Sequence, residues 1–208
     1  MDGVFMRKIF KLLICVTVLG LLMEYTGVLR DRKLLNDGII RLHVVAASDS
    51  EEDQAVKLQV RDAVVAYVEE AMTHVMTLQE AKAWLEENLP GIQQAANAVL
   101  SKLGLSYEAE VTLAKEPFPV RHYDSFSLPA GVYNSLRISL GKAQGQNWWC
   151  VVFPRLCLPA AGESVEDAAE VGGFAQPLTN TLTQKEGYCI RFFALELLGR
   201  LENFFFRK

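Results

Sequence analysis

Residues 39–75 constrain the fold most, because an alternating segment leads through a polar turn directly into a segment of helical periodicity. Over residues 39–47, apolar side chains occupy one face while Arg41 and His43 occupy the other, which is typical of a half-buried strand. In the turn of residues 48–53, Ser48 or Asp49 can cap a helix, and the carboxylates of residues 51–53 are favoured at its positive end. This part of the chain predicts a strand followed by a capped helix.

The segment after the turn predicts a long amphipathic helix. Its apolar residues recur every three or four positions and form one stripe of about six turns: Val56, Val60, Val64, Tyr67, Val68, Ala71, Met72 and Val75. Lys57 and Arg61 lie four residues apart, after Asp53, and we interpret them as solvent-facing. The alternative is that these two cations form the rim of a docking site for an acidic partner loop.

Two further helices are expected. Thr77 and Glu80 have the spacing of a capping box, which starts a helix. Pro90 and Gly91 are expected to interrupt that helix. A third helix then continues to Gly104, because a residue without Cβ suits the left-handed conformation at a helix end.

The periodicity changes to two in the second half of the chain, which predicts strands. Apolar and polar residues alternate over residues 107–113 and again over 132–140, and residues 148–153 are rich in strand-forming side chains. The last two segments are joined by a glycine-containing loop and predict an antiparallel hairpin. Residues 115–131 contain several prolines without periodicity, so an irregular loop is expected there.

The C-terminal part is less regular. Residues 159–187 are small, acidic and glycine-containing, and we expect a flexible linker or insertion. Residues 188–193 are expected to add a strand before a short amphipathic helix. We interpret the aromatic residues 204–206 as core packing, with contact to a membrane surface as the alternative.

These elements predict an α+β fold, with helices packed on one face of a mainly antiparallel sheet, in the order β-α-α-α-β-β-β with a C-terminal helix. The chain divides into five expected parts: 1–26, a signal peptide or N-terminal membrane anchor; 27–38, a linker; 39–158, the α+β domain; 159–187, the flexible linker or insertion; and 188–208, the strand and amphipathic helix.

Residues 1–23 have the features of an export signal. Arg7, Lys8 and Lys11 form a positive start, and residues 12–23 are apolar and uncharged. This run is shorter than the roughly 20 residues that span a bilayer. No Ala-x-Ala cleavage site follows it, so removal of the segment and its retention as an anchor both stay open.

Charge and composition exclude several classes of function. The net charge is −4, half of the residues are hydrophobic, and no basic patch is interleaved with aromatics, so we expect a folded protein that does not bind nucleic acid. The acidic residues 49–53 lack the glycine and the spacing of a calcium-binding EF-hand loop. No Cys–His cluster indicates zinc, and we expect neither a metal nor a cofactor.

The cysteines predict a disulfide in an exported chain. Cys150 and Cys157 bracket a short segment in which Pro154 helps the chain to turn back, and we predict a bridge between them. Cys189 is also able to pair with either of these residues, and the sequence leaves that choice open.

A hydrolase is the alternative to a binding protein. Two groups combine a histidine with hydroxyl and carboxylate side chains: His43 with Ser48, Asp49 and Ser50, and His122 with Asp124 and Ser125. Neither group has the G-x-S-x-G motif, and a catalytic triad is defined by geometry rather than by spacing. We therefore expect a protein that is not an enzyme, and keep a secreted or membrane-anchored hydrolase using His43 or His122 as the alternative.

Two blocks of sequence resemble the stage II sporulation protein R family of endospore-forming bacteria. The first block reads RLHVVAASDS at residues 41–50, followed by Asp53-Gln54 and by KLQVRDAV at 57–64. The second reads LPAG-x-Y from Leu128, LRI-x-LG from Leu136, and G-x-NWWCVVFP from Gly145, with Leu156-Cys157 after it. One departure is Ala47, where the family tends to have Asn.

The resemblance implies an intercellular signal rather than a protease. Members of the family are made in the forespore and exported into the space between the forespore and mother-cell membranes. There they activate a membrane-embedded aspartic protease of the mother cell, which processes the sigma-E precursor. This protease is therefore the expected partner, and the N-terminal segment is the expected membrane contact.

We expect the partner-binding surface to include three regions: the polar turn, the cationic face of the first helix, and the doubled tryptophan. The residues are Arg41, Ser48, Asp49, Asp53, Lys57, Arg61, Trp148 and Trp149. The rings of Trp148 and Trp149 should point to opposite faces of a strand. An outward Trp is a good contact anchor, while the alternative is that both rings are covered by helices and by the proline-containing loop.

Overall fold

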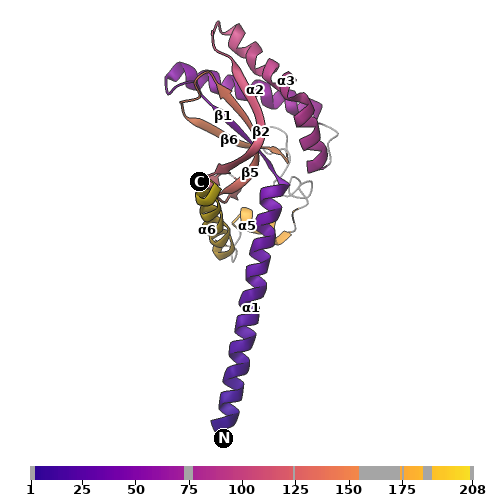
Figure 1. Ribbon diagram of the computed structural model, residues 1–208, viewed down its shortest axis with the longest axis vertical. Coiled ribbons are helices and arrows are strands. Elements are labelled where there is room, and N and C mark those ends of the chain that lie inside the picture. The colour runs from indigo at the N-terminus through magenta and orange to yellow at the C-terminus, as the bar shows by residue number, and fades with distance from the viewer. Residues whose placement is uncertain are drawn as a thin grey trace.

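The computed structural model describes residues 3–72, 77–123, 125–154, 174, 176–184 and 189–206, with the side chains of residues 3–5, 177 and 189 excepted. Its helices and strands follow in chain order (Figure 1): α1 (Gly3–Gly38), β1 (Ile40–Val45), α2 (Glu51–Ala71), α3 (Leu78–Lys102), β2 (Ala109–Phe118), β3 (Arg121–His122), β4 (Ser127–Leu128), β5 (Gly131–Leu140), β6 (Asn147–Phe153), α5 (Gln176–Leu182) and α6 (Cys189–Phe206).

The main sheet has four strands in the order β2-β5-β1-β6. Strand β1 runs parallel to β5, with Leu42 opposite Leu136, and antiparallel to β6, with His43 opposite Trp149. Strand β2 is antiparallel to β5. Two of the three pairings are antiparallel, which confirms the expected α+β fold with a mainly antiparallel sheet.

The predicted hairpin between the last two strands is wrong, because β1 lies between β5 and β6. The loop after β5 crosses the end of β1 and bonds to it: the Gly145 amide donates to the Ala46 carbonyl at 3.0 Å, and the Gln144 amide to Ala47 at 3.3 Å. Strand β1 is almost wholly buried, because its central position gives it two pairing partners and both of its faces are covered.

Helices α2 and α3 cover one face of the sheet and form the main core with it (Figure 1). Ser50 caps α2, and Thr77 with Glu80 forms the predicted capping box of α3. The predicted break at Pro90 is wrong, since α3 continues through it. Leu85 and Ile92, on either side of the proline, are both fully buried, so packing of this face holds the helix together at the cost of one amide hydrogen bond.

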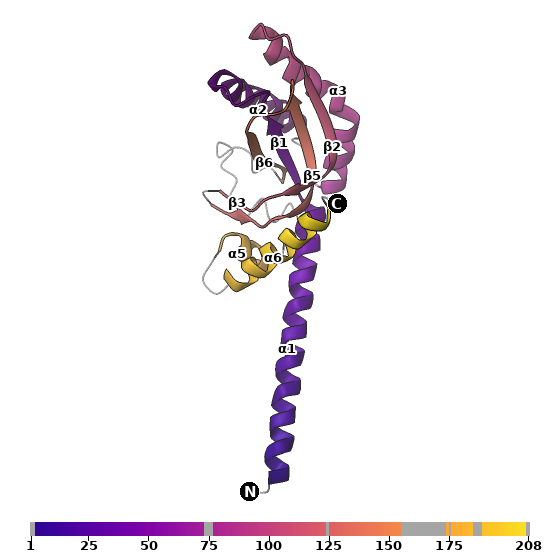
Figure 2. The same ribbon diagram turned by 60° about the vertical axis from the view of Figure 1, so that its left-hand side comes forward.

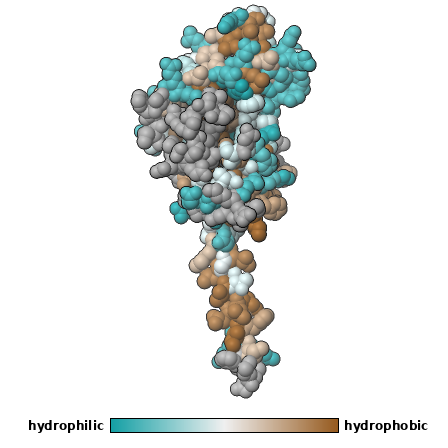
Figure 3. All heavy atoms as spheres, turned by 180° about the vertical axis from the view of Figure 1, so that it is seen from behind, coloured by the Kyte–Doolittle hydropathy of each residue, from teal (hydrophilic) through white to brown (hydrophobic). Residues whose placement is uncertain are grey.

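Residues 27–38, the expected linker, form the end of α1, which is one helix from Gly3 to Gly38. Val28 and Leu35, two turns apart, are buried against the domain, and Lys115 of β2 bonds Asp37 at 2.8 Å. The preceding part of α1 projects away from the domain as a long shaft (Figure 2). Its surface is formed by apolar side chains (Figure 3).

A second core lies on the other face of the sheet, where the end of α1, α5 and α6 pack near β5 (Figure 2). The predicted strand at residues 188–193 is wrong in its described part, because α6 begins at Cys189. Phe192 and Leu195 recur at helical spacing and are buried, which favours a docked helix over a strand. The aromatic residues 204–206 are exposed, so the core packing expected for them is also wrong.

The expected flexible segment 159–187 falls mostly outside the described residues. Within it, residues 176–182 form α5, where Leu178 and Leu182 are buried in the second core. This part of the segment is therefore a packed helix.

Candidate functional site

The structure brings the polar turn, the first two turns of α2 and the start of β6 to one end of the sheet. The loop of residues 141–146 joins them, because it hydrogen-bonds to the end of β1 and leads into β6. Gly145 in this loop lies directly against the Ser48 carbonyl and the Ala46 side chain, where a Cβ would not fit. The polar turn, the start of α2 and the start of β6 are therefore neighbours at this end of the sheet.

The turn itself is fixed by hydrogen bonds to Asp53. The Ser48 hydroxyl donates to one carboxylate oxygen of Asp53, and the Tyr107 hydroxyl donates to the other at 2.7 Å. These bonds hold the pKa of Asp53 below its usual range, and the bond from Ser48 has the largest effect. Asp53 and Ser48 are therefore partly buried structural groups, while Asp49 is exposed and accessible to a partner.

Lys57 is not on the solvent-facing side of α2, as the sequence analysis expected. Its side chain is buried, and its ammonium donates to Gln54 Oε1 at 2.6 Å and to the Gln146 carbonyl at 3.2 Å. Burial lowers the pKa of Lys57. Lys57 thus ties α2 to the loop of residues 141–146, because the helix face that it occupies is covered by that loop.

Arg61 and Trp148, which are far apart in sequence, form a stacked pair. The Arg61 guanidinium lies 4.3 Å from the centre of the Trp148 ring, and it also bonds Asp62. Trp148 keeps 36% of its surface exposed and stands on β6, which is an edge strand of the four-stranded sheet. A partly exposed cation–π pair beside a strand edge is well suited to contact another protein.

Trp149 points to the opposite face, which confirms the prediction that the two rings diverge. Its ring stacks on His43 with centroids 5.7 Å apart, and the Arg121 guanidinium lies 3.7 Å from its centre. Arg121 belongs to β3, which pairs with β4 in a short hairpin over this face. Trp149 is thus half-covered, and its position on the sheet surface depends on the hairpin.

Arg41 is fully buried and does not belong to the contact surface, contrary to expectation. Its guanidinium lies 4.2 Å from the Phe118 ring centre and 5.1 Å from that of Tyr133, and it donates to the Tyr123 hydroxyl at 3.1 Å. Among the residues that the structure describes, its Nε and Nη1 atoms have no hydrogen-bond partner. The sheet face on which Arg41 stands is covered by the second core, which encloses the side chain.

Replacing Arg41 separates the role of its volume from that of its charge. Arg41→Met is expected to change the free energy of unfolding by about 1 kcal/mol or less, because Met fills the space, contacts the rings and removes an unpaired buried charge. Arg41→Ala should cost about 3 kcal/mol through the cavity it leaves. Urea denaturation measures both, and equal losses would contradict this assignment.

Glu116 of β2 links three strands on the same face. It accepts hydrogen bonds from His43 Nδ1 at 3.0 Å and from Arg137 at 2.8 Å, and His43 Nε2 lies 2.9 Å from Asn147 Oδ1. Burial raises the pKa of Glu116, but the bonds from His43 and Arg137 outweigh it and lower the pKa to about 2. His43 is therefore a structural bridge between β1, β2 and β6, rather than a solvated residue.

This network predicts a specific loss of stability in acid. The pKa of Glu116 is lowered from 4.5 to about 2 on folding, so its contribution is complete above pH 4.5 and declines as the pH falls towards 2. After allowance for solvent screening, it amounts to about 1–2 kcal/mol. Glu116→Gln should flatten this part of the pH profile measured by urea denaturation, whereas Glu110→Gln, at an exposed position of β2, should leave it as in the parent. Parallel pH profiles of the unfolding free energy for the parent and Glu116→Gln would refute this role of Glu116.

Among the described residues, the side chains considered for hydrolysis do not form a catalytic triad. The partners of His43 are Glu116 and Asn147, while Ser48 and Ser50 bond within the turn. His122 Nδ1 bonds the buried Ser127 hydroxyl at 2.8 Å, and Asp124 lies outside the described residues. Among the described residues, no group of three or more His, Cys, Asp or Glu side chains is placed to hold a metal.

Sequence reasoning missed the residues that organise this region. Glu116 and Tyr107 belong to no motif, Asn147 lies in the second block of the family resemblance without an assigned role, and each acts on a residue at least 50 positions away. Glu116 falls in residues 115–131, for which an irregular loop was expected, but β2 continues through it to Phe118. Cys150 is disulfide-bonded, and its partner lies outside the described side chains, so the pairing with Cys157 stays a prediction.

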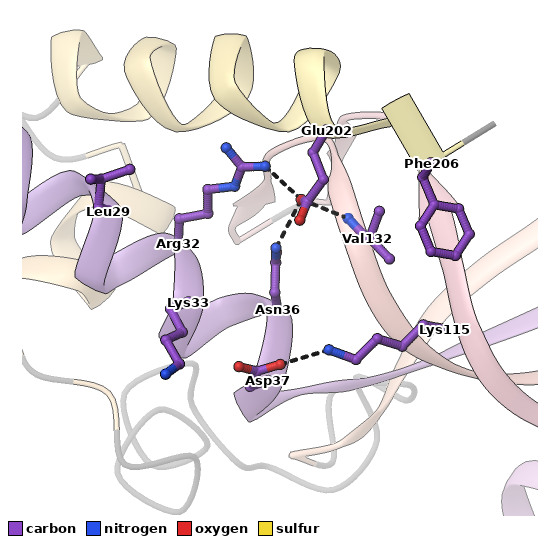
Figure 4. Close-up of a pocket in the computed structure, with 9 residues that line it drawn as sticks. All are labelled: Leu29, Arg32, Lys33, Asn36, Asp37, Lys115, Val132, Glu202 and Phe206. Carbon is purple, nitrogen blue, oxygen red and sulfur yellow. Dashed lines mark hydrogen bonds and ion pairs between the residues drawn. The ribbon is translucent and has the colours of Figure 1, made fainter. Parts of the chain in front are cut away.

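A cavity of about 440 Å³ lies between the end of α1, β5 and α6 (Figure 4). Glu202 of α6 accepts bonds there from Arg32 at 2.6 Å, from Asn36 at 2.9 Å and from the Val132 amide at 3.3 Å. Because its central carboxylate already pairs with α1 and β5, we interpret this cavity as the joint between two helices and the sheet.

Comparison with known proteins gives consistent matches. The family model described as "Stage II sporulation protein R (spore_II_R)" matches residues 36–163. The chain is 34% identical over 160 residues to a Bacillus subtilis (strain 168) protein named "Stage II sporulation protein R", covering 75% of this chain and 71% of that protein. No solved structure matches.

Proposed function

Because this chain belongs to the stage II sporulation protein R family, we propose that it is a non-enzymatic signalling protein of sporulation. It is made in the forespore and exported into the space between the forespore and mother-cell membranes. There it binds a membrane-embedded aspartic protease of the mother cell, and this protease then processes the sigma-E precursor.

The observation that carries the proposal is the family match, which covers all strands of the main sheet and α2. The apolar helix α1 supports export, since Met6–Gly38 is long and apolar enough, by length and composition, to cross a membrane. A signal peptide and an anchor both fit this helix, and retention would keep the domain beside its membrane-embedded partner.

The contact surface that we propose is centred on Arg61 and Trp148, with Asp49 at its margin. Binding through this surface activates the protease only if this chain has higher affinity for the active state of the protease than for the inactive one. The edge of β6 beside Trp148 offers backbone groups to an extended segment of the protease, which is a common mode of peptide recognition. Lys57 supports this surface through its bond to the loop of residues 141–146. Neither Lys57 nor Arg41, which is buried in the second core, touches the partner.

Reconstitution in a non-sporulating host tests the proposal. The chain is co-expressed with the protease and the sigma-E precursor, and cleavage of the precursor is followed by immunoblot. Cleavage is expected only when both the chain and the protease are present, and it should vanish when a catalytic Asp of the protease is replaced by Asn. No cleavage from a folded, exported chain with its matched protease would refute the proposal.

The same assay discriminates the hydrolase alternative. Cleavage that persists with the inactive protease would show that the chain itself is the enzyme. His122→Gln should then abolish the activity, as should His43→Gln, if either side chain takes part in catalysis. For a ligand, the exported variants should still support cleavage, since neither histidine belongs to the proposed contact surface.

A further inference from the structure

Helix α6 has an apolar face that is largely exposed in the described part of the chain. Its other face is docked, with Phe192 and Leu195 buried in the second core. Six large side chains on the opposite face are between 50% and 84% exposed: Ile190, Phe193, Leu197, Leu201, Phe204 and Phe205. The apolar arc of an amphipathic helix normally faces the core, so a fully apolar outer face requires another apolar environment.

The orientation of α6 is fixed by close contacts, so this face cannot turn inward. Gly199 lies against the Ala130 carbonyl, where any Cβ would collide with the backbone. Glu202 bonds Arg32, Asn36 and the Val132 amide one turn later (Figure 4). These contacts hold α6 by its inner side against both α1 and β5.

The position of α6 relates this apolar face to α1. Arg191 at the start of α6 bonds Asp31 at 2.6 Å and lies 3.8 Å from Glu24. Helix α6 therefore lies at the end of the domain from which the α1 shaft projects (Figure 2). The sheet lies on the docked side of α6 (Figure 2). The exposed face therefore points away from the domain, in the direction in which the shaft projects.

The sequence and length of the shaft indicate which part of α1 would lie inside a membrane. The apolar run of residues 12–23 has exposed side chains (Figure 3) and, together with Ile9 and Phe10 before Lys11, extends about 23 Å at 1.5 Å per residue, which is most of the hydrocarbon thickness of a bilayer. Glu24 and the exposed Tyr25 follow at once, as expected at the interface with water. Arg191, paired with Glu24 and Asp31, places the start of α6 at this interface.

We propose that α6 is a membrane-contacting helix, whose outer face lies against the lipid bilayer that α1 crosses. Ile190, Phe193 and Leu197, nearest the shaft, enter the boundary between headgroups and acyl chains, in the manner of an interfacial amphipathic helix. The domain then has two attachments, which restrict its tilt relative to the membrane. This inference takes α1 to be retained as a membrane anchor, the second of the two roles that fit it under the proposed function, and does not depend on activation of the protease.

Fluorescence quenching by brominated lipids tests this inference on the full chain. Phe193→Trp and, independently, Leu197→Trp are reconstituted into vesicles of phosphatidylethanolamine and phosphatidylglycerol with brominated acyl chains. Each added Trp is expected to lose most of its emission relative to vesicles without bromine, after subtraction of the parent chain. Leu103→Trp, at an exposed apolar position at the far end of α3, is the matched control and should lose none.

The outcomes separate the two proposals. Retention of the parent chain in carbonate-washed vesicles, with quenching at 193 or 197, supports the inference. Retention without quenching at either position overturns it while the anchoring role of α1 stands, and loss of the chain from the vesicles overturns both. A third outcome is that quenching is absent at first and appears only when the chain is diluted into excess vesicles. This would assign the face to a second copy of the chain, and so would also overturn the inference.

Discussion

Combining Arg61→Glu with Trp148→Ala is expected to abolish precursor cleavage in the reconstituted system. The two side chains form one stacked pair at the surface, so the double change removes the aromatic anchor and reverses the charge beside it. Truncation of a binding hot spot typically costs about 2–4 kcal/mol, which corresponds to a loss of affinity of roughly 30-fold to nearly 1,000-fold. Cleavage by immunoblot and binding to the purified protease measure the effect.

The matched control is Lys102→Glu with Leu103→Ala at the end of α3. These residues are also exposed, and the changes also reverse one charge and truncate one apolar side chain. The control should signal like the parent chain, and both variants should be exported at equal levels. Full cleavage with the Arg61–Trp148 variant would place the contact surface elsewhere on the domain.

Gly145→Ala is expected to destabilise the domain by about 2–3 kcal/mol, although it adds a single methyl group. The added Cβ would overlap the Ser48 carbonyl, which belongs to the backbone and cannot rotate away. Relief requires the loop of residues 141–146 to move, and this movement breaks its bonds to Ala46 and Ala47 and the bond from Lys57. The midpoint of urea denaturation should fall at unchanged slope.

Lys142→Ala is the control for this loop, because it changes an exposed side chain of the same segment. Its effect should stay within about 0.5 kcal/mol. Gly145→Ala should also weaken signalling, because the loop positions both the polar turn and the start of β6. A Gly145→Ala variant as stable as the parent would show that the contact with Ser48 is not tight.

Local patterns in the sequence determined the elements that depend on neighbouring residues. The capping box of Thr77 with Glu80 forms as predicted, because the capping side chains and the amides they bond lie within three residues. The polar turn also caps α2 as expected, but the capping residue is Ser50 rather than Ser48 or Asp49. Trp148 and Trp149 diverge because successive side chains of a strand point to opposite faces. The composition of strands and helices likewise predicted the α+β class, since periodicities of two and 3.6 are local properties.

Only the tertiary structure decided which elements meet. The position of β1 between β5 and β6 arises from competition among strands, and no pattern within a single strand records its neighbour. The same reason explains Arg41 and Lys57: each is polar by sequence, yet segments about 80 to 90 residues away cover it. Packing on both sides of Pro90 likewise outweighs the local tendency of proline to end a helix.

The candidate surface shows both contributions. Residue type alone indicated Arg61 and the doubled tryptophan, because exposed Trp and Arg are favoured at interfaces. That Arg61 meets Trp148 rather than Trp149, and that α6 turns its apolar side outward beside α1, depends on contacts between elements at opposite ends of the chain. Burial and pairing are sums over distant neighbours, so they exist only once the whole domain has folded.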